Sequence, residues 1–426
     1  MISEDLLQFI WQYSLYHPVN LQTTSGESLT VIHPGKLNKN AGPDFEEARI
    51  KIGRTTFVGN VELHLRTSDW HRHQHQHDKA YRNLILHVVY EDDAEDATHS
   101  FPKLVLQSHI PGYVLERYTD LLHSSRHIPC ASQLPFINDL INESLLNRML
   151  AERWEQKLND WEDELHRNAG DWHNLLYLRL AVNFGFKINA APLLQLAKSL
   201  PVNLFAKHKH SLLQIEALLF GQAGFLDEDF TEEYPLQLQK EYAFLQKKYG
   251  LHPLEKHRWK FLRLRPANFP TLRIAQFAVL IHQSLHLFSQ IIESNTPDEL
   301  RKLLNVTASA YWDNHYRFGE AQPKPLKKKL GISSVDNILI NTVAPLRFLF
   351  AHRQDNFHEQ ENALQLLTHV PPERNNIISL WNENGWMAAN AAQSQALIQL
   401  YHHYCSRKRC LECAIGLGII KKNSEN

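Results

Sequence analysis

The sequence predicts an α+β protein, in which a mixed N-terminal α/β domain over residues 1–125 precedes a large helical domain over residues 126–426. Near the N-terminus, helix and strand patterns follow each other as one helix, three strands, a short helix and further strands. From about residue 135, apolar residues instead recur every three or four positions, which is the spacing of amphipathic helices. Hydrophobic residues make up 43% and charged residues 21%, which excludes a largely disordered or collagen-like chain.

The N-terminal domain is expected to begin with a helix after Ser3, whose hydroxyl is a favourable N-cap. Strands are expected at 29–33, 48–52 and 56–65, where apolar residues alternate with polar ones or where β-branched and aromatic residues gather. A short helix fits 78–83, the apolar run 84–90 predicts a strand buried on both faces, and 103–107 fits a last strand.

The second domain has helical spacing over 145–154, 172–184 and 274–292. Residues 335–351 are nearly all apolar and contain Pro345, so they predict a buried and kinked helix. Residues 323–330 read as a basic linker or exposed turn. No fixed repeat indicates a solenoid.

Charge and composition exclude several classes of protein. The chain has 45 Lys and Arg against 46 Asp and Glu, so it is not a basic nucleic-acid coat protein. Its four cysteines are too few for an oxidised, secreted framework of this length. No run approaches the roughly 20 apolar residues that a membrane span needs, and the first residues lack the pattern of a signal peptide. We therefore expect a cytoplasmic protein without a membrane partner, whose oligomeric state stays open.

The densest polar pattern lies in the N-terminal domain. Gly42-Pro43 forms a turn that delivers Asp44 to the start of a strand, and Glu62 and His64 share one face of the next strand. If these strands pair as a hairpin, the three side chains converge. Two carboxylates suit Mg²⁺ or Mn²⁺, and an imidazole can orient a water or accept its proton. Taken singly, each residue also fits a plain structural role, such as a turn aspartate that caps its own backbone.

An Asp before one strand and Glu-x-Lys in the next is the pattern of the PD-(D/E)XK phosphodiesterase superfamily. Over roughly residues 1–110 this chain resembles that superfamily in element order, in Pro43-Asp44 and in Glu62-x-His64, with His64 in the usual place of Lys. The resemblance implies a restriction-endonuclease-like core and metal-dependent cleavage of DNA or RNA. It assigns Mg²⁺ or Mn²⁺ to Asp44 and Glu62, and the attacking water to His64.

The whole chain also resembles an uncharacterised bacterial family, domain of unknown function 2851. This resemblance does not indicate any particular activity. The stretches that carry this resemblance are the Cys-rich tail and residues 40–45, 59–64, 68–70, 86–89 and 265–270.

A histidine run follows the acidic motif, with His71, His73, His75 and His77 at alternate positions. Imidazoles at this spacing can bind Zn²⁺. We keep His73, His75 and Asp78 as second-tier candidates for a second metal or for phosphate contact. The alternative is an exposed His-rich loop that binds metal only adventitiously.

The four cysteines form a second candidate site. Cys405, Cys410 and Cys413 have the spacing C-x₄-C-x₂-C, and Cys130 is the only other cysteine of the chain. Together they make a four-thiolate set suited to Zn²⁺ or to an Fe–S cluster. Spacing alone leaves both open, and the alternative is four ordinary thiols of a cytoplasmic protein.

A basic stretch with interleaved aromatic residues lies in the second domain. Basic side chains neutralise phosphates and aromatic rings stack on unpaired bases, so the stretch is a candidate DNA or RNA surface. Amphipathic helices with solvated basic faces explain the same pattern. The candidate residues are Lys256, Arg258, Lys260, Arg263, Arg265 and Arg273.

Three hypotheses of function follow from these patterns. The first is a metal-dependent phosphodiesterase that uses Asp44, Glu62 and His64. The second is a non-catalytic nucleic-acid-binding or scaffold protein on a degenerate nuclease-like fold, which the histidine in place of lysine supports. The third is hydrolysis at a histidine-based zinc site.

Overall fold

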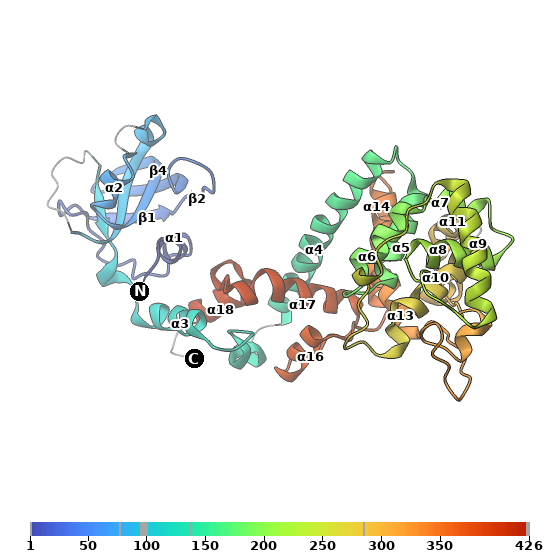
Figure 1. Ribbon diagram of the computed structural model, residues 1–426. Coiled ribbons are helices and arrows are strands. Elements are labelled where there is room, and N and C mark those ends of the chain that lie inside the picture. The colour runs from blue at the N-terminus through green and yellow to red at the C-terminus, as the bar shows by residue number, and fades with distance from the viewer. Residues whose placement is uncertain (1, 76–77, 94–100, 137–138, 284–285, 423–426) are drawn as a thin grey trace. The chain divides into compact units, whose positions relative to one another are not determined.

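The computed structural model describes residues 2–75, 78–93, 101–136, 139–283 and 286–422. Its contacts divide the chain into two compact units. The N-terminal unit comprises Met1–Leu146, Glu383–Trp386 and Gln399–Asn426, so the C-terminal tail belongs to it. The helical unit comprises Asn147–Asn382 and Met387–Ile398. The fold is mixed, with a curled N-terminal sheet followed by helices (Figure 1).

The N-terminal unit begins with helix α1 (Glu4–Gln12), whose first turn is capped by Ser3 as expected. The Ser3 side chain accepts a hydrogen bond from the backbone N–H of Leu6, satisfying one of the free N–H groups of that turn. Leu7 and Ile10 are fully buried, and α1 packs against the sheet at β4.

The sheet has the order β1-β3-β4-β5-β6, with the two-residue β2 beside β3. The pairs β1–β3 and β3–β4 are antiparallel, whereas β4–β5 and β5–β6 are parallel. The expected hairpin between the second and third long strands is therefore present. The strands span Leu29–His33 (β1), Lys36–Leu37 (β2), Phe45–Ile52 (β3), Thr55–Arg66 (β4), Leu84–Glu91 (β5) and Lys103–Val105 (β6).

Several details of the N-terminal unit differ from the sequence prediction, and the first is that β3 begins at Phe45 rather than at residue 48. The expected helix before β5 is the 3₁₀ helix η2 (Lys79–Asn83), and β6 ends two residues early because a 3₁₀ turn, η3 (Gln107–His109), follows it. The short strand β2 was not predicted, since two residues carry no period. Further helical segments complete the unit and lead out of it: α2 (Asp69–Arg72), α3 (Gly112–His123), η4 (Ala131–Phe136), α4 (Asp139–Arg167), α17 (Ala391–His403), η9 (Cys405–Arg407), η10 (Cys410–Glu412) and α18 (Ala414–Lys421).

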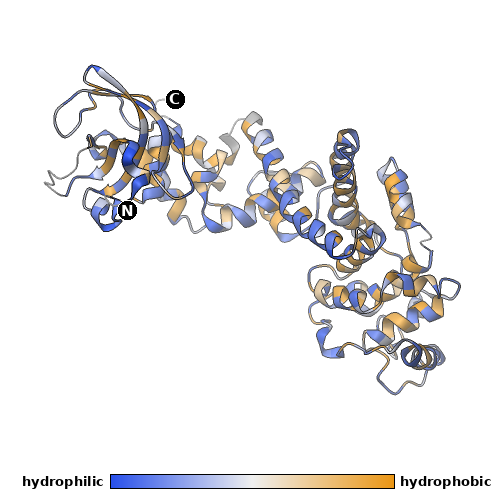
Figure 2. Ribbon diagram, turned by 90° about the horizontal axis from the view of Figure 1, so that it is seen from above, coloured by the Kyte–Doolittle hydropathy of each residue, from blue (hydrophilic) through white to orange (hydrophobic). Residues whose placement is uncertain are grey.

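The helical unit is built from helices that carry both hydrophilic and hydrophobic residues (Figure 2). Its largest fully buried side chains include Phe184, Phe220, Phe277, Trp312 and Trp381. The α-helices of this unit among the described residues are α5 (Trp172–Phe184), α6 (Ala190–Ser199), α7 (Val202–Ala206), α8 (Leu212–Gln222), α9 (Glu233–Tyr249), α10 (Pro270–Gln283), α11 (Leu287–Glu293), α12 (Pro297–Leu303), α13 (Ile332–Ile338), α14 (Ala344–His352) and α15 (Phe357–Thr368). Helix α16 (Asn376–Glu383) belongs to it except for its last residue.

The single helix expected over 274–292 is two helices, α10 and α11, because His286 adopts a left-handed conformation with φ 66°. None of the helices in the described parts of the chain is long and apolar enough to cross a bilayer.

The expected distortion around Pro345 is a π-helical segment, Leu339–Val343, between α13 and α14. Proline has no N–H to donate and its ring crowds the carbonyl four residues earlier, which is that of Asn341. A wider π turn relieves this crowding. The Asn341 carbonyl instead accepts a hydrogen bond from Lys157 Nζ at 3.2 Å, so the helix remains continuous and its backbone remains satisfied.

Candidate metal centre

A β-bulge in β3 sets the position of Asp44. Between the pairs Ala48–Gly59 and Phe45–Val61 the register shifts by one residue, and Glu47 takes a left-handed φ of 58° within the bulge. The shift puts Asp44 across from Glu62, whereas an unbroken register would place it across from Leu63 and reverse its face. The bulge therefore brings the two carboxylates to the same side of the sheet.

Each acid accepts a hydrogen bond from a backbone N–H at the other acid or at the residue next to it. The Asp44 N–H donates to Glu62 Oε2 at 2.9 Å, and the Leu63 N–H donates to Asp44 Oδ2 at 3.0 Å. Gln8 of α1 donates to Asp44 Oδ1 at 2.8 Å. Glu62 is 4% exposed, and its second oxygen, Oε1, points to a group of imidazoles.

Burial raises the pKa of both acids. The pKa of Glu62 lies well above its ordinary value, first because the side chain is desolvated and second because the Asp44 carboxylate is close. The pKa of Asp44 is also raised by burial, although the Leu63 N–H opposes the shift. Two carboxylates held this way resist carrying two negative charges, and a cation between them would relieve the repulsion.

Three imidazoles converge beside Glu62. The ligand nitrogens of His64, His73 and His75 all lie within 4.8 Å of one another. Glu62 Oε1 lies 3.6 Å from His64 Nε2 and 3.3 Å from His75 Nε2. His64 is buried, His75 is half-buried and His73 is exposed, so the group opens towards solvent on the side of His73.

His64 presents a neutral ring to this group. Its Nδ1 lies 2.9 Å from His87 Nε2 on the neighbouring strand, while its Nε2 is buried and makes no hydrogen bond within the described residues. Burial lowers the pKa of His64 to about 2, and the nearby imidazoles add to the effect. If the Nδ1 proton is donated to His87, a lone pair remains on Nε2 and faces Glu62.

Aromatic rings support the imidazoles. The His75 ring lies 4.2 Å from that of Tyr81, and Trp70 packs edge-on against His64 with centroids 6.3 Å apart. Trp70 and Tyr81 are 3% and 6% exposed and belong to one apolar cluster. The group is therefore fixed by its surroundings rather than carried on a free loop.

The structure brings together Asp44, Glu62, His64, His73 and His75, all of which the sequence predicted. Asp78, the other second-tier candidate, is an exposed N-cap whose Oδ1 accepts from the Ala80 N–H at 2.9 Å. His77 lies outside the described residues.

Two residues of the centre were missed as site residues, His87 and Gln8. Glu62 and His87 are direct partners across β4 and β5. The signal for His87 was a polar residue inside the otherwise apolar strand 84–90. Gln8, in contrast, carries no such signal in the sequence.

The four cysteines all lie in the N-terminal unit. Cys130, Cys405 and Cys413 are buried and Cys410 is half-buried. Burial raises the pKa of Cys130 to about 12 and that of Cys410 to about 11, and neighbouring cysteines add to both shifts. The thiols are thus close enough to influence each other.

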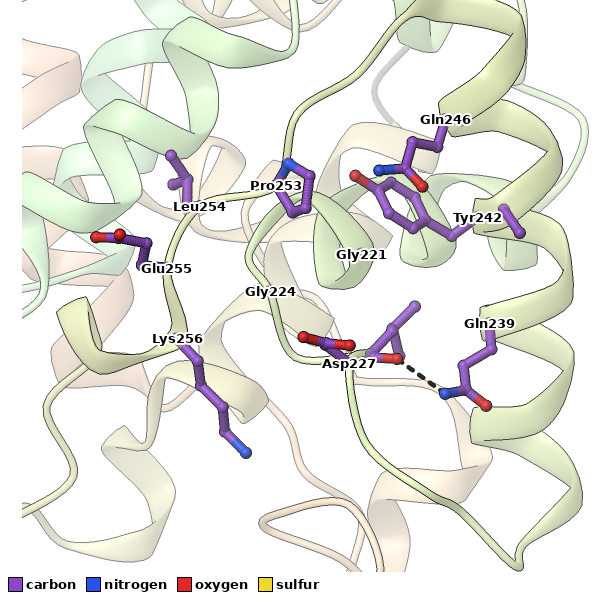
Figure 3. Close-up of a pocket in the computed structure, with 12 residues that line it drawn as sticks. Gly221, Gly224, Asp227, Gln239, Tyr242, Gln246, Pro253, Leu254, Glu255 and Lys256 are labelled. Carbon is purple, nitrogen blue, oxygen red and sulfur yellow. Dashed lines mark hydrogen bonds between the residues drawn. The ribbon is translucent and has the colours of Figure 1, made fainter.

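The basic candidates lie in the helical unit and have different surroundings. Lys256 pairs with Glu228 and lines a cavity of about 610 Å³ (Figure 3). Arg258 donates to Gln195, and Lys260 Nζ donates to the His257 carbonyl at 3.5 Å. Arg263 and Arg265 are exposed and form no ion pair with any described residue.

Arg273, the sixth basic candidate, is only 5% exposed. Its guanidinium donates to Asn268, Gln276 and Ser334 and stacks on Phe186. In this structure Arg273 is therefore part of the helical core, away from a surface that phosphates could reach.

Comparison with known proteins yields a family but no activity. A family model described as "Protein of unknown function (DUF2851)" matches residues 4–376. No curated protein and no solved structure matches the chain.

Proposed function

The chain belongs to the DUF2851 family of proteins of unknown function, and we propose that it is a metal-dependent phosphodiesterase acting on DNA or RNA. Its centre would be Glu62 with His64, His73 and His75, next to Asp44. The observation that carries the proposal is the convergence of three imidazole nitrogens, with the buried Glu62 Oε1 lying 3.6 Å and 3.3 Å from two of these imidazoles, His64 and His75.

The spacing between Glu62 Oε1 and two of the imidazoles fits neighbouring ligands of one bound ion. Zinc binds nitrogen and oxygen ligands at about 2.0–2.1 Å, so two ligands of a tetrahedral site lie roughly 3.4 Å apart. Glu62 Oε1 lies 3.3 Å from His75 Nε2 and 3.6 Å from His64 Nε2. Imidazole donors suit Zn²⁺ and other transition ions better than Mg²⁺, which prefers oxygen ligands. We therefore favour Zn²⁺ or Mn²⁺ over Mg²⁺ at this centre.

Further contacts support this assignment because they orient the ligands. Histidines that bind metals usually donate their other ring N–H to a neighbour, and His87 is that neighbour for His64. Asp44 holds Glu62 through its own backbone N–H, and Gln8 holds Asp44. These contacts leave Glu62 Oε1 turned towards the imidazoles.

The bound ion would polarise the phosphate and lower the pKa of a water. The exposed side of the centre at His73 is where a phosphodiester would enter. Hydrolysis forms a bond from the water oxygen to phosphorus, breaks one P–O ester bond, and passes a proton to the departing alcohol oxygen. Asp44, whose backbone N–H donates to Glu62 and whose pKa is raised towards neutral pH, would accept the water proton.

The fold and the surface agree with this chemistry. A helix, three long antiparallel strands, a helical turn and a parallel strand follow each other along the chain, and this element order supports the proposed nuclease-like core. In the helical unit, Arg263 and Arg265 offer exposed positive charge for phosphates.

The test uses the full-length protein, stripped with EDTA and supplied with Zn²⁺, Mn²⁺ or Mg²⁺. Labelled single-stranded DNA, duplex DNA and RNA are followed for cleavage products. Glu62→Gln removes the carboxylate at the centre, and His64→Asn removes the buried imidazole. Glu46→Gln is the matched control, because Glu46 is an exposed acid on the same strand as the bulge.

We expect cleavage by the wild type and by Glu46→Gln with Zn²⁺ or Mn²⁺, and a loss of at least a hundredfold in Glu62→Gln, the size expected for an essential ligand or base. Binding of the same substrates without cleavage, at equal affinity in wild type and Glu62→Gln, would instead support a non-catalytic nucleic-acid-binding protein and overturn the proposal.

A further inference from the structure

A turn of the helical unit, residues 261–264, holds a leucine out in solvent. Leu262 is 82% exposed. The Leu264 N–H donates to the Phe261 carbonyl at 3.2 Å, which closes a four-residue turn with Leu262 and Arg263 at its centre. An apolar side chain with this much surface in water gains almost nothing from burial. Packing within the chain therefore does not explain the leucine at this position.

The backbone of the same turn is strained. Arg263 has a left-handed φ of 62°, and it is the third residue of the turn, where a positive φ normally selects glycine or asparagine. A bulky residue keeps such a conformation only when its surroundings hold it, and strain of this kind gathers at sites of function. The strain places Leu262 at the tip of the turn.

The chain that enters the turn is firmly anchored. Trp259 is 5% exposed, and its Nε1 donates to the Ala223 carbonyl at 2.8 Å. The buried side chain of Asn189 binds both backbone groups of Lys260, because its Oδ1 accepts from the Lys260 N–H and its Nδ2 donates to the Lys260 carbonyl, each at 2.9 Å. The backbone on this side of the tip is therefore fixed.

The base of the turn and the chain that leaves it are anchored as well. The Phe261 ring packs edge-on against the Phe269 ring with centroids 5.1 Å apart. The Arg317 guanidinium lies over both rings, at 4.5 Å from Phe261 and 4.8 Å from Phe269. Between them, the 3₁₀ turn η6 (Pro266–Asn268) stiffens the backbone. Leu262 is thus presented on a rigid tip.

The surroundings of the tip are basic. Residues 256–292 contain no Asp or Glu. Lys260, Arg263 and Arg265 are exposed, and none of the three forms an ion pair with an acid among the described residues. An apolar side chain flanked by unpaired cations fits a polyanion that also offers an apolar surface. Nucleic acid has both, in its phosphates and in its stacked bases.

We propose that Leu262 inserts between two neighbouring base pairs of a bound nucleic-acid duplex, while Lys260, Arg263 and Arg265 hold the adjacent phosphates. Apolar side chains that enter a base step partly unstack it and bend the duplex. The inference rests on the proposed function only for the class of partner, DNA or RNA. It assigns to the helical unit a contact that deforms this partner, beyond the attraction of its positive charge.

A single rigid leucine suits a base step better than a membrane surface. Even one acyl chain gives only marginal attachment to a bilayer, and one leucine is far smaller. Between bases, in contrast, one apolar side chain is enough to part a step. Stacked bases resist this insertion, so the side chain must be held firmly. The anchored turn meets that requirement.

The test uses a short DNA duplex with a fluorescent donor and acceptor at its two ends. One duplex has a TA step at its centre, which kinks easily, and a second has a stiff A-tract there. Full-length protein is added in EDTA, so that affinity and bending are measured by energy transfer without cleavage. Leu262→Ala removes most of the wedge and Leu262→Phe keeps one. Leu236→Ala is the matched control, because Leu236 is an exposed leucine of α9.

We expect the wild type, Leu262→Phe and Leu236→Ala to bend the TA duplex by about 20–90° and to bind it more tightly than the A-tract duplex. Leu262→Ala should bind the TA duplex about tenfold more weakly, since the burial of one leucine is lost. It should also bend this duplex little and show no preference between the two. Arg263→Gln should weaken the binding of both duplexes equally, because phosphate contacts carry no direct sequence information.

A Leu262→Ala protein that binds and bends the duplexes as the wild type does would overturn this proposal, even if the protein cleaves DNA. Binding to phosphatidylserine vesicles that depends on Leu262, without bending of DNA, would also overturn it and would assign the tip to a membrane surface. A bend that depends on Leu262, without cleavage in any metal ion, would leave this proposal standing and refute the catalytic one. No binding of either duplex by the wild type would overturn both.

Discussion

Replacing Glu62 by Gln is expected to stabilise the metal-free protein and to abolish its response to metal. The Glu62 carboxylate is buried beside Asp44, and both effects raise its pKa. An amide of the same shape removes this repulsion while its oxygen still accepts the Asp44 N–H. Relief of one unfavourable site commonly adds about 0.5–2 kcal/mol to the free energy of unfolding. We therefore expect metal-free Glu62→Gln to melt at a higher temperature than the wild type.

Metal should add more to the free energy of unfolding of the wild type than the substitution adds to that of Glu62→Gln. A ligand at one hundred times its dissociation constant adds about 2.7 kcal/mol to stability. For a unit of this size 1 kcal/mol shifts the melting temperature by about 2–4 °C, so the metal should raise it by about 5–11 °C. Glu62→Gln lacks one of the four proposed ligands and should show little of this shift.

Differential scanning calorimetry in EDTA and in Zn²⁺ or Mn²⁺ measures both quantities, with Glu46→Gln as the control that should follow the wild type. Two results would refute the reasoning. The first is a metal shift in Glu62→Gln as large as in the wild type, which would place the ion elsewhere. The second is a metal-free Glu62→Gln that melts below the metal-free wild type, which would mean that the carboxylate is stabilising where it lies.

Three more predictions concern the helical unit and the tail. Burial raises the pKa of Glu216 from 4.5 to about 7, so the folded state binds this proton more tightly than the unfolded state. The free energy of unfolding should therefore fall by about 3 kcal/mol as the pH rises from 4.5 through 7. Thermal melts of Glu216→Gln between pH 4.5 and 8 should lack this fall. A Cβ at Gly221 would lie 2.1 Å from the Tyr242 ring, so Gly221→Ala should lower the free energy of unfolding in urea by about 1–3 kcal/mol. The control Gly418→Ala should not lower it, because no atom lies within 4 Å of the added Cβ. If Arg263 contacts a phosphate, Arg263→Gln should reduce the salt dependence of nucleic-acid affinity by about one counterion, measured by fluorescence anisotropy across salt concentrations.

Much of the sheet was predictable because its signals are local. The alternation of apolar and polar residues over residues 48–52 and the apolar run of β5 each follow from the period of a strand. The hairpin between β3 and β4 follows from their short connection at Gly53, which takes a left-handed φ of 57°. The spacing of Glu62 and His64 then puts both on one face.

The bulge and the pairing of β4 with β5 were not predictable in the same way. A bulge is one extra residue in a ladder, and Glu46-Glu47 looks like ordinary strand sequence. The parallel register that pairs Glu62 with His87 depends on the path of the chain between the strands, including the segment that carries His73 and His75. Tertiary packing decides both the bulge and the parallel register. The spacing in the sequence therefore predicted that the acids meet only on the condition that the two strands pair.

The histidine run shows where a compositional argument falls short. Alternating His and Gln residues are typical of an exposed loop, and His71 and His73 are indeed exposed. His75 behaves differently because it follows a left-handed Gln74 (φ 59°), which redirects the chain towards Tyr81 and Glu62. The left-handed conformation of Gln74 therefore turns His75 inward, where it joins the exposed His73 in the centre.

The centre as a whole is a poor arrangement for stability alone. His64 has almost no exposed surface, and its Nε2 makes no hydrogen bond among the described residues. The Glu62 carboxyl group is buried next to a second acid, Asp44. An apolar pair at these two strand positions would pack without either cost. A cation among these groups would satisfy the nitrogen and neutralise the acids at once, so the metal binding proposed above would offset both costs.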